Sequence, residues 1–539
     1  MKKKSPLSNQ RYWVLIFSIC LVLLTALPYL LAASQKGAQF TGFLIGVDDG
    51  NSYIAKMQTG AEGDWLFRSP YTAEEQRGAL IYLPYILLGK LLGPGAQHAP
   101  LILLFHIYRS ISIIVLCFAI YDFLSHFVAD VKLRRLGLTL ITLGSGLGWI
   151  LLFIGVPNLL GSIPLDFYSP EAFGFLAIFS LPHLVLARAL LLWGLLGYLH
   201  ISEGAEKVRI FRIVLLWLAL ALVHLITAAL GILLIAAHFG FVFIRNYLNK
   251  KKESGIYPHF QAVSWAMLGV APVLASNAWT YWQDSYLRAW AAQNQILSPN
   301  PLHYLVAYGL LLPFAYIGLR TLLRNHWASA SFLLTWLVLL PFMLYAPVGL
   351  QRRLSEGAWV MLNVLALCAF DGARKKGVQK VRDSRELWLF SLALPSTLIL
   401  FLGSLQAAQN VQPPVFRPDA EVSAFDQLRQ IAAVGDVVLT SYETGNVLPA
   451  WVPIRVVAGH GPESVGLERL LPRIQAIYQG RTTDDTRLEF FQRYRVDYVF
   501  WGPNEQRFGS WIPGEEDYLE KVIDVVGYEV YRVSEEAIQ

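Results

Sequence analysis

The chain has 539 residues, of which 55% are hydrophobic and only 15% are charged, and its formal net charge is +6. This composition excludes an ordinary soluble globular protein and is typical of a protein with many membrane-spanning helices. The positive charges lie in short clusters between apolar runs, which indicates membrane topology and argues against a nucleic-acid partner. Cys20, Cys117 and Cys368 all lie in apolar runs, and their spacing matches neither a disulfide pair nor a Cys-x-x-Cys metal site.

Eleven apolar runs predict membrane-spanning helices, each of which needs about 20 residues to cross a bilayer core. They lie near residues 12–33, 99–122, 135–156, 174–200, 211–226, 229–246, 261–281, 301–319, 327–346, 354–370 and 387–405. The run at 79–93 is shorter and contains Pro84, so it predicts a juxtamembrane or re-entrant helix. The first run is longer than the roughly 7–15 residues of a signal-peptide core, so we expect a retained helix.

The basic residues between these runs predict the orientation of the chain. With eleven spans and a cytoplasmic N-terminus, every basic cluster falls on the cytoplasmic side, as the positive-inside rule requires. The clusters are Lys132/Arg134/Arg135, Lys207/Arg209/Arg212, Arg245/Lys250/Lys251/Lys252, Arg320/Arg324 and Arg374/Lys375/Lys376/Lys380/Arg382. The loops at 34–98, 157–173, 282–300 and 347–353 are therefore predicted to lie on the outer face, together with the tail.

The tail at 406–539 is more polar, and we expect it to form a small extracytoplasmic α/β domain after a membrane domain at 1–405. Pro413-Pro414 is typical of a linker. Alternating patterns predict helices at 420–434, 466–479 and 484–494, and strands at 436–440, 454–457, 496–500 and near 526–533. The segments 441–446 and 459–463 follow predicted strands, where ligands bind in α/β sheets. We interpret them as structural turns, with acceptor binding as a further role.

Two adjacent carboxylates, Asp48 and Asp49, follow the first apolar run. On the predicted outer face, a carboxylate beside a membrane cavity acts as a general base or binds a divalent cation. The alternative is a turn, which the following Gly50-Asn51 favours.

The residues after Asp49 form a spaced motif, Asp49-x-x-x-Tyr53-x-x-x-Met57-x-x-Gly60, followed by Gly63-Asp64-Trp65. This motif resembles the first outer loop of the GT-C superfamily of membrane glycosyltransferases. In that superfamily an acidic residue after the first membrane helix precedes an aromatic residue, a helical stretch and a Gly-Asp-Trp-like segment. The resemblance implies that Asp49, rather than Asp48, is the catalytic carboxylate. It also implies substrate-binding positions at Tyr53 and at Arg109 in the second apolar run.

The second outer loop contains Asp166 and Glu171. The resemblance implies that this loop supplies a second acidic residue, which orients the acceptor or, together with Asp49, holds a divalent cation such as Mg or Mn. The alternative is a solvated loop in which Glu171 caps the next helix after Pro170. In the apolar run that follows, His183 contacts substrate if it faces a cavity, and buried polar pairing is the alternative.

Arg352 and Arg353 are the exception to the charge rule, because they lie in a predicted outer loop. A guanidinium group binds phosphate with two parallel hydrogen bonds. We therefore expect these arginines to bind the phosphate of a lipid-linked donor, with lipid headgroups as the alternative.

Together these features predict an integral-membrane, inverting glycosyltransferase with Asp49 as the general base. The resemblance implies a polyprenyl-phosphate-sugar donor taken from the lipid bilayer of the cell membrane, and a glycan, lipid or protein acceptor. One alternative is a transporter or flippase of lipid-linked substrates, although the chain shows no internal repeat. Another is a non-catalytic membrane protein whose outer domain binds a partner.

Overall fold

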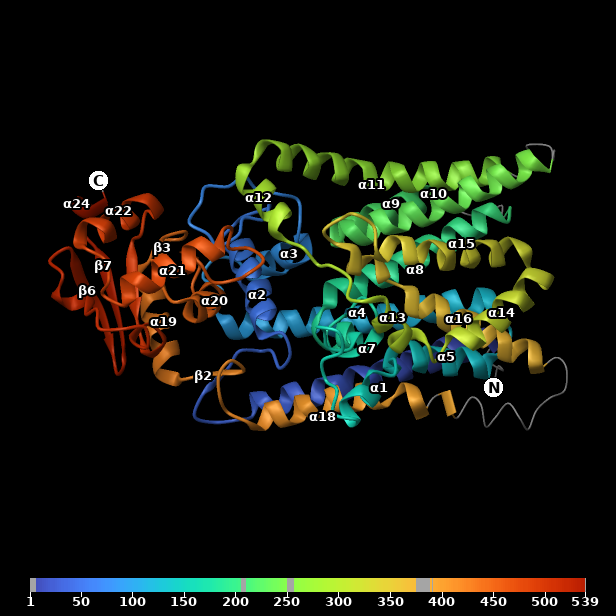
Figure 1. The fold of residues 1–539 in the computed structure, drawn as a ribbon, viewed down its shortest axis with the longest axis horizontal. Coiled ribbons are helices and arrows are strands. Elements are labelled where there is room, and N and C mark those ends of the chain that lie inside the picture. Colours follow the sequence, from blue (N-terminus) through green and yellow to red (C-terminus); the bar gives the residue numbers. More distant parts are fainter. Residues whose placement is uncertain (1–5, 205–209, 250–255, 375–387, 390, 539) are drawn as a thin grey trace. The chain divides into compact units, whose positions relative to one another are not determined.

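The computed structural model describes residues 6–204, 210–249, 256–374, 388–389 and 391–538, and the chain divides into two compact units (Figure 1). The helical unit consists of Met1–Leu27, Tyr108–Ala275 and Gln295–Gly403. The mixed unit consists of Pro28–Ile107, Ser276–Asn294 and Ser404–Gln539. The predicted domain boundary at 405 stays a prediction. In the division above, the tail belongs to one unit together with Pro28–Ile107, which includes the predicted first outer loop, and with Ser276–Asn294.

Helices make up almost all of the regular structure of the helical unit. They are α1 (Pro6–Ala33), α4 (His98–Phe127), α5 (Val131–Leu143), α6 (Gly148–Phe153), α7 (Gly174–Ser180), α8 (Pro182–Ser202), α9 (Ile210–Val223), α10 (Leu225–Leu248), α11 (Tyr257–Gln283), α13 (Pro301–Tyr308), α14 (Leu312–Asn325), α15 (Trp327–Leu344), α16 (Ala358–Arg374) and α18 (Pro395–Gln409). The short 3-10 helices η1 (Leu165–Phe167) and η3 (Gln351–Ser355) interrupt the series. Helices α1, α4, α11 and α18 also supply residues to the mixed unit.

Seven helical segments among the described residues are long and apolar enough to cross a membrane. They lie in α1, α4, α8, α10, α11 and α15, and in η3 with α16. The pair α13 and α14, bent by 74°, raises the number to eight when it is counted as one broken span. These segments make the chain an integral membrane protein.

Besides the run at 301–319, which forms α13 and α14, two further predicted spans are divided in the structure. The run at 135–156 forms α5 and α6, because the glycine-rich segment between them approaches other backbone closely. A Cβ atom on Gly146 would lie 2.4 Å from the Ala307 carbonyl oxygen, and the Ser145 N–H donates to the Ala393 carbonyl at 2.7 Å. The run at 174–200 forms α7 and α8. They separate at Leu181 because Pro182 disfavours helical backbone at the residue that precedes it.

The remaining predictions for the membrane part have mixed outcomes. The short helix predicted at 79–93 is confirmed by α3 (Leu83–Leu92), whose ten residues are too few for a full span. The run at 211–226 forms α9, which has 14 residues. The predicted orientation of the chain stays a prediction, because many residues of the basic clusters lie outside the described part of the chain. They are Lys207, Arg209, Lys250, Lys251, Lys252, Lys375, Lys376, Lys380 and Arg382. Residues 387 and 390 of the last predicted span also lie outside it.

The mixed unit contains a five-stranded sheet with the strand order β4-β3-β5-β7-β6. The central strands β4 (Arg455–Val456), β3 (Val437–Leu439) and β5 (Tyr498–Trp501) are parallel, with Val438 opposite both Val456 and Tyr498. Strands β7 (Tyr528–Val533) and β6 (Leu519–Val525) extend the sheet in antiparallel pairing. Buried aromatic side chains such as Phe491 and Tyr531 form its core.

Most of the predicted elements of the tail are confirmed. The three predicted helices are α19 (Asp419–Ile431), α21 (Leu467–Tyr478) and α22 (Asp484–Tyr494), and the four predicted strands are β3, β4, β5 and β7. Helix α20 (Tyr442–Trp451) was missed because Gly445 and Pro449 lower helix propensity. Strand β6 was missed because charged side chains on an edge strand interrupt the apolar alternation. Short elements complete this part: β2 (Phe416–Arg417), α23 (Pro503–Gln506), η4 (Pro513–Glu515) and α24 (Glu535–Ile538).

Helix α2 (Val47–Ala61) holds the candidate site in the mixed unit. It begins after Gly46, whose left-handed backbone (φ 63°) favours glycine. It packs closely against α3, because a Cβ atom on Gly89 would lie 1.8 Å from the Met57 carbonyl oxygen. It also packs against α20. Strand β1 (Gln39–Phe40), which precedes α2, pairs with β2, and α12 (Ser285–Gln293) follows α11.

Candidate functional site

The two candidate carboxylates lie in the first turn of α2. Asp48 and Asp49 are exposed, and 57% of the Asp49 side chain is accessible. The unpaired N–H groups and the dipole of a helix N-terminus stabilise negative charge. The helix N-terminus therefore favours negative charge on a side chain that remains accessible to a substrate.

One face of α2 continues from Asp49 into the interior of the mixed unit. Ser52 and Lys56 follow Asp49 at intervals of three and four residues, which places them on the same side of the helix. Lys56 is fully buried, and its Nζ donates to the carbonyl oxygen and to Oγ of Ser52 at 3.2 and 2.8 Å. Nζ also lies 4.4 Å from the ring centre of Tyr82 and 5.6 Å from that of Tyr53, within the range of cation–π attraction.

The buried ammonium group of Lys56 pairs with a buried carboxylate from the tail. Lys56 Nζ lies 2.5 Å from Oε1 of Glu463, whose side chain is 2% exposed. The hydroxyl of Ser69 donates to Glu463 Oε2 at 2.6 Å, and the hydroxyl of Tyr286 donates to the Glu463 carbonyl oxygen at 2.7 Å. These bonds fix the segment 459–464 against α2 and the loop that follows it.

The same segment carries a buried histidine. His460 is 5% exposed, and the Oγ of Ser464 accepts hydrogen bonds from the backbone N–H groups of Gly459 and His460 at 3.0 and 3.2 Å. Ser464 Oγ in turn donates to the Tyr71 carbonyl oxygen at 2.9 Å. The backbone at His460 is therefore anchored to Ser464 and, through it, to Tyr71.

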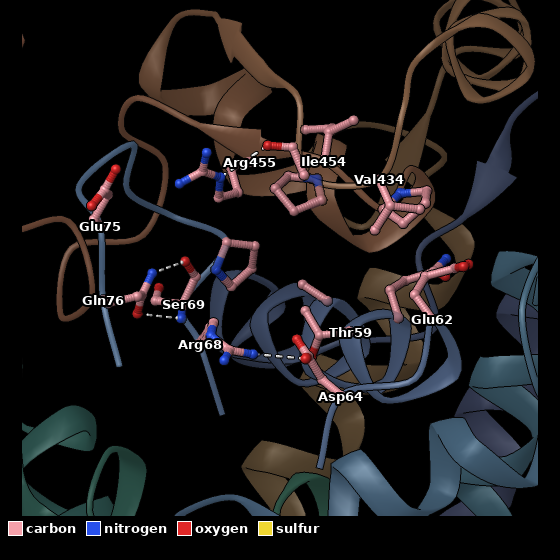
Figure 2. Close-up of a pocket in the computed structure, with 16 residues that line it drawn as sticks. Thr59, Glu62, Asp64, Arg68, Ser69, Glu75, Gln76, Val434, Ile454 and Arg455 are labelled. Atoms are coloured by element: carbon pink, nitrogen blue, oxygen red, sulfur yellow. Dashed lines mark hydrogen bonds and ion pairs between the residues drawn. The ribbon is translucent and has the colours of Figure 1, made fainter. Parts of the chain in front are cut away.

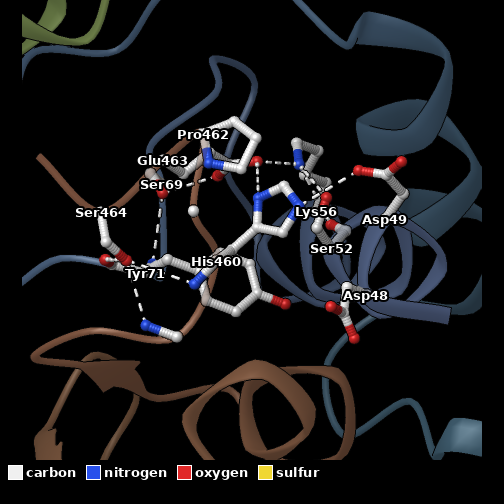
Figure 3. A network of polar contacts seen from close by, with 12 residues as sticks. Asp48, Asp49, Ser52, Lys56, Ser69, Tyr71, His460, Pro462, Glu463 and Ser464 are labelled. Carbon is white, nitrogen blue, oxygen red and sulfur yellow. Dashed lines mark hydrogen bonds and ion pairs between the residues drawn. The ribbon is translucent and has the colours of Figure 1, made fainter. Parts of the chain in front are cut away.

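His460 lies between two carboxylates, as Figure 3 shows. Its Nε2 is 3.2 Å from Asp49 Oδ1, and its Nδ1 is 3.4 Å from Glu463 Oε1. Ionised carboxylates accept hydrogen bonds only, so both ring nitrogens face acceptors and the imidazolium form suits both contacts. The result is a continuous polar chain from Lys56 through Glu463 and His460 to Asp49.

The pKa values of the buried groups follow from these contacts. Burial alone would raise the pKa of Glu463, but Lys56 and His460 lower it to about 2. Burial alone would lower the pKa of His460, but its contacts with Asp49 and Glu463 raise it above the ordinary value. Burial lowers the pKa of Lys56, and Glu463 opposes that change. Glu463 is therefore ionised at neutral pH, and its charge favours the imidazolium form of His460.

Asp48 has a different environment from Asp49. Partial burial raises the pKa of Asp48, as do the carboxylates of Asp49 and Glu443, whereas His460 lowers it. Its backbone carbonyl accepts a hydrogen bond from Nδ2 of Asn446 at 3.3 Å. Asp49, with Nε2 of His460 3.2 Å from one of its oxygens, is the better candidate for the base.

A second feature of α2 is a pocket of about 550 Å³ on another face (Figure 2). Among its described lining residues are Gln58 from α2, Glu62 directly after α2, and Arg455 from β4. Its polar side chains bond mainly to one another or to the backbone: Arg68 donates to Asp64, as Figure 2 shows. Neither Asp48 nor Asp49 is among the described residues that line this pocket, so we place the chemistry on the Asp49 face.

The helical unit contains a second charged cluster. Glu171 Oε1 lies 3.7 Å from Nε of Arg353, whose side chain is 28% exposed. Arg188 is buried and pairs with both oxygens of the buried Glu356. Arg188 also donates to the carbonyl oxygens of Pro170 and Phe173 at 2.8 and 3.1 Å. Arg188 and Glu356 therefore tie the loop that carries Glu171 to the segment that carries Arg353.

The other predicted residues of the helical unit contact polar or aromatic side chains, and three of them are buried: Asp166, Arg109 and His183. Asp166 is 2% exposed and accepts a hydrogen bond from Ser396 Oγ at 2.9 Å. Arg109 is 1% exposed and donates to Thr25 Oγ1 at 3.1 Å. The buried His183 ring lies 5.8 Å from that of His224, and the guanidinium of Arg352 lies 4.6 Å from the ring centre of Tyr168.

The predicted site residues divide between the two units. Asp48, Asp49 and Tyr53 belong to the mixed unit, whereas Arg109, Asp166, Glu171, His183, Arg352 and Arg353 belong to the helical unit. Within the helical unit the structure brings Glu171 and Arg353 together. Their catalytic and binding roles stay predictions.

The donors around Asp49 do not fit a divalent cation. Glu463, the nearest buried carboxylate, already contacts the ammonium group of Lys56, and the His460 nitrogen that faces Asp49 suits a proton. In the described part of the chain, no group of three or more His, Cys, Asp or Glu side chains is arranged to hold a metal ion. The expectation of Mg or Mn stays a prediction, and no step below depends on it.

Comparisons with known proteins rest on the fold. No protein-family model matches the chain, and no curated protein sequence matches it. Among solved structures, the oligosaccharyltransferase AglB from Archaeoglobus fulgidus, in complex with an inhibitory peptide and a dolichol-phosphate, matches with a TM-score of 0.53 at 11% identity. That match covers 98% of this chain and 75% of AglB. The chain has the GT-C fold.

Two further solved structures agree with this fold. ArnT from Cupriavidus metallidurans in the apo state matches with a TM-score of 0.50 at 12% identity, over 98% of this chain and 99% of ArnT. The arabinofuranosyltransferase AftD from Mycobacteria matches with a TM-score of 0.54 at 14% identity, over 97% of this chain and 42% of AftD. At these identities the likeness shows the fold alone. The GT-C fold expected from the Asp49 motif is confirmed.

Three residues of the Asp49 network were missed at the level of sequence. Lys56 lies in the motif but was not singled out, and the segment with His460 and Glu463 was interpreted as structural turns. One signal was present: this segment follows strand β4 at its carboxyl end, where α/β sheets place ligand-binding side chains. The link to Asp49 spans 411 positions, which local sequence patterns do not predict.

Proposed function

We propose that the chain is a membrane glycosyltransferase that moves a sugar from a lipid-phosphate-linked donor to an acceptor hydroxyl. The single observation that carries this proposal is the exposed Asp49 carboxylate, held by His460 at the N-terminus of α2. The fold supports it, because structures that share this fold include an oligosaccharyltransferase bound to dolichol-phosphate and an arabinofuranosyltransferase.

In the proposed reaction Asp49 acts as the general base. Its carboxylate accepts the proton of the acceptor hydroxyl while the hydroxyl oxygen attacks the anomeric carbon of the donor. The bond from that carbon to the phosphate oxygen breaks, and the lipid phosphate leaves with the electron pair. A single displacement of this kind inverts the configuration of the sugar. Asp48 is the weaker candidate, because Asp49 and not Asp48 lies four positions before Tyr53 in the motif, and because His460 contacts the Asp49 carboxylate at 3.2 Å.

Arg353 and Arg352 are the proposed binders of the departing phosphate. A guanidinium group stabilises the charge that develops on the phosphate oxygens as the bond breaks. Glu171 lies near Arg353, and the Arg188–Glu356 pair holds both segments in place. Glu171 would thus orient the arginine that receives the phosphate.

The proposed orientation places this chemistry on the outer face, with the N-terminus in the cytoplasm. The support comes from the positive-inside rule applied to the basic clusters of the sequence. The polar tail at 406–539 would then form an extracytoplasmic domain. A linker-like segment at Pro413-Pro414 precedes the strands of this domain.

Reconstitution of the full chain in liposomes tests this proposal against its alternatives. The liposomes would contain polyprenyl-phosphate sugars, each labelled in the sugar, and candidate acceptors would be supplied on one side. A transferase releases the label from the lipid and joins it to an acceptor. A flippase moves the intact labelled lipid to the other leaflet, and a partner-binding protein does neither.

The expected result is acceptor-dependent transfer of label from at least one donor, with loss of transfer in the Asp49→Asn variant. Intact labelled lipid that only changes leaflet would contradict the proposal. A protein-dependent release of free sugar that is unaffected by Asp49→Asn would contradict the role of Asp49.

A further inference from the structure

We infer that His460 is a positioning residue that directs the Asp49 carboxylate toward the acceptor, so that the segment 459–464 of the tail completes the catalytic site. The inference rests on the proposed function, in which Asp49 accepts the acceptor's proton. It adds a residue that lies 411 positions from Asp49 and outside the GT-C-like motif.

An exposed carboxylate at a helix end is a poorly oriented base. More than half of the Asp49 side chain is accessible, so packing restricts its rotamers less than it restricts those of a buried side chain. A general base must hold its oxygen within hydrogen-bond reach of the proton that it removes. Contact with a fixed donor at 3.2 Å, the Nε2 of His460, removes much of that freedom.

His460 has the rigidity that this task requires. Its backbone N–H donates to Ser464 Oγ, its ring packs 5.4 Å from the ring of Tyr71, and its Nδ1 faces Glu463. Glu463 is itself fixed by Lys56 and Ser69. Lys56, Glu463 and His460 are each more buried than Asp49. The polar contacts therefore run from the interior of the unit outward to the exposed Asp49 carboxylate.

Fold stability alone does not account for this arrangement. The Lys56–Glu463 pair already balances the buried charges, and Ser69 donates to the second Glu463 oxygen. An additional imidazole that reaches from the buried pair to an exposed carboxylate costs desolvation. The same geometry, a histidine oriented by a buried carboxylate and presented to a reacting group, is how catalytic histidines are held in place.

The chain offers a matched control for His460. His98 belongs to the same unit, is 6% exposed and stacks on Trp451 with ring centroids 3.6 Å apart. Substitutions at His98 therefore disturb a buried histidine of similar exposure without touching the Asp49 network.

The test compares His460→Gln, His460→Phe, His98→Gln and His98→Phe in the reconstituted full chain, with the wild type and Asp49→Asn. Glutamine keeps an N–H donor that reaches toward Asp49, whereas phenylalanine keeps the ring and loses the donor. For each protein, kcat, the KM for the labelled lipid-linked sugar and the thermal unfolding midpoint would be measured.

A misplaced catalytic group costs about 100-fold in rate. We therefore expect His460→Phe to lower kcat about 100-fold while the donor KM stays within a factor of three of the wild type, and His460→Gln to recover at least about a tenth of wild-type kcat. The His98 variants should keep kcat. In the Asp49→Asn background, His460→Phe should cause no further loss, because its effect passes through Asp49.

Three outcomes would overturn the inference. If the wild type is active and His460→Phe keeps full kcat, the inference fails while the proposed function stands. The same holds if His460→Phe and His460→Gln lose kcat equally and this loss follows the fall in their unfolding midpoints. An inactive wild type with every donor would instead overturn the proposed function, and this inference with it.

Discussion

The ion pair between Lys56 and Glu463 gives the most specific stability prediction. Both side chains are buried, at 0% and 2% exposure, with 2.5 Å between Nζ and Oε1. Substituting Lys56 by methionine keeps the length of the side chain and its contacts with Tyr82 and Tyr53. It removes the ammonium group from the buried Glu463 carboxylate, which keeps, among cationic partners in the described part of the chain, only the longer contact of 3.4 Å with His460 Nδ1. Removing one partner of a buried pair costs about 3–5 kcal/mol. For a unit of this size that loss lowers the unfolding midpoint by roughly 6–20 °C.

The assay is thermal unfolding of the purified full chain in detergent micelles, followed by tryptophan fluorescence. Lys56→Met should unfold far below the wild type, and Lys56→Met with Glu463→Gln should regain at least half of the loss, because no buried charge remains unpaired. Lys90 is the matched control: it also lies over an aromatic ring, Trp65, but bonds to a backbone carbonyl. Lys90→Met should cost less than about 1 kcal/mol.

Two results would refute the reasoning about this pair. One is a Lys56→Met variant that unfolds with the wild type, since the carboxylate would then not depend on the ammonium group. The other is a double variant that unfolds at or below the single variant, since the penalty would then come from lost packing rather than from an unpaired charge.

Three further predictions follow from the same structure. Arg188→Met should destabilise the chain by about 3–5 kcal/mol in the same unfolding assay, because Glu356 loses its buried partner; a shift below about 1 kcal/mol would contradict the pairing. The Glu463 carboxylate has an ordinary pKa of 4.5 and a pKa of about 2 in the folded chain, so its contribution to stability is complete above about pH 5 and is lost as pH falls through about 2. The wild type should therefore lose stability over this pH range more steeply than Glu463→Gln. Equal pH slopes of stability for the two proteins would contradict this role of Glu463. Arg353→Lys should raise the donor KM about 10-fold through the loss of a bidentate phosphate contact. The control is Arg493→Lys, which changes an exposed arginine that pairs with Glu74 and should leave KM unchanged. Equal KM values for the wild type, Arg353→Lys and Arg493→Lys would argue against phosphate binding at Arg353.

The fold was largely predictable because its strongest signals are local. Apolar runs of about 20 residues mark membrane helices, and the alternation of the tail marks its strands and helices. The breaks at 144–147 and at Leu181 were harder, because an apolar run looks continuous where glycine or proline interrupts the helix. Helix α20 depends on packing against α2, which overrides the weak propensity of Gly445 and Pro449.

The candidate site was predictable only in part. The spacing from Asp49 to Tyr53 is a short motif within one helix, so the family resemblance that rests on this motif was enough to prefer Asp49 over Asp48. The partners of Asp49 lie in the tail, and nothing local in Gly459–Glu463 states which carboxylate His460 meets. Lys56 illustrates the same difficulty: a lysine in an amphipathic helix is usually solvated, and only the fold shows that it is buried against Glu463.

The central claim is that Asp49 is the base of a sugar-transfer reaction. The most direct measurement is the rate of label transfer from a polyprenyl-phosphate sugar by Asp49→Asn and Asp48→Asn, side by side with the wild type at equal amounts of folded protein. We predict that Asp49→Asn lowers kcat at least about 100-fold, as expected for loss of a general base, while Asp48→Asn stays within about 10-fold of the wild type. Equal rates for Asp49→Asn and the wild type would contradict the account.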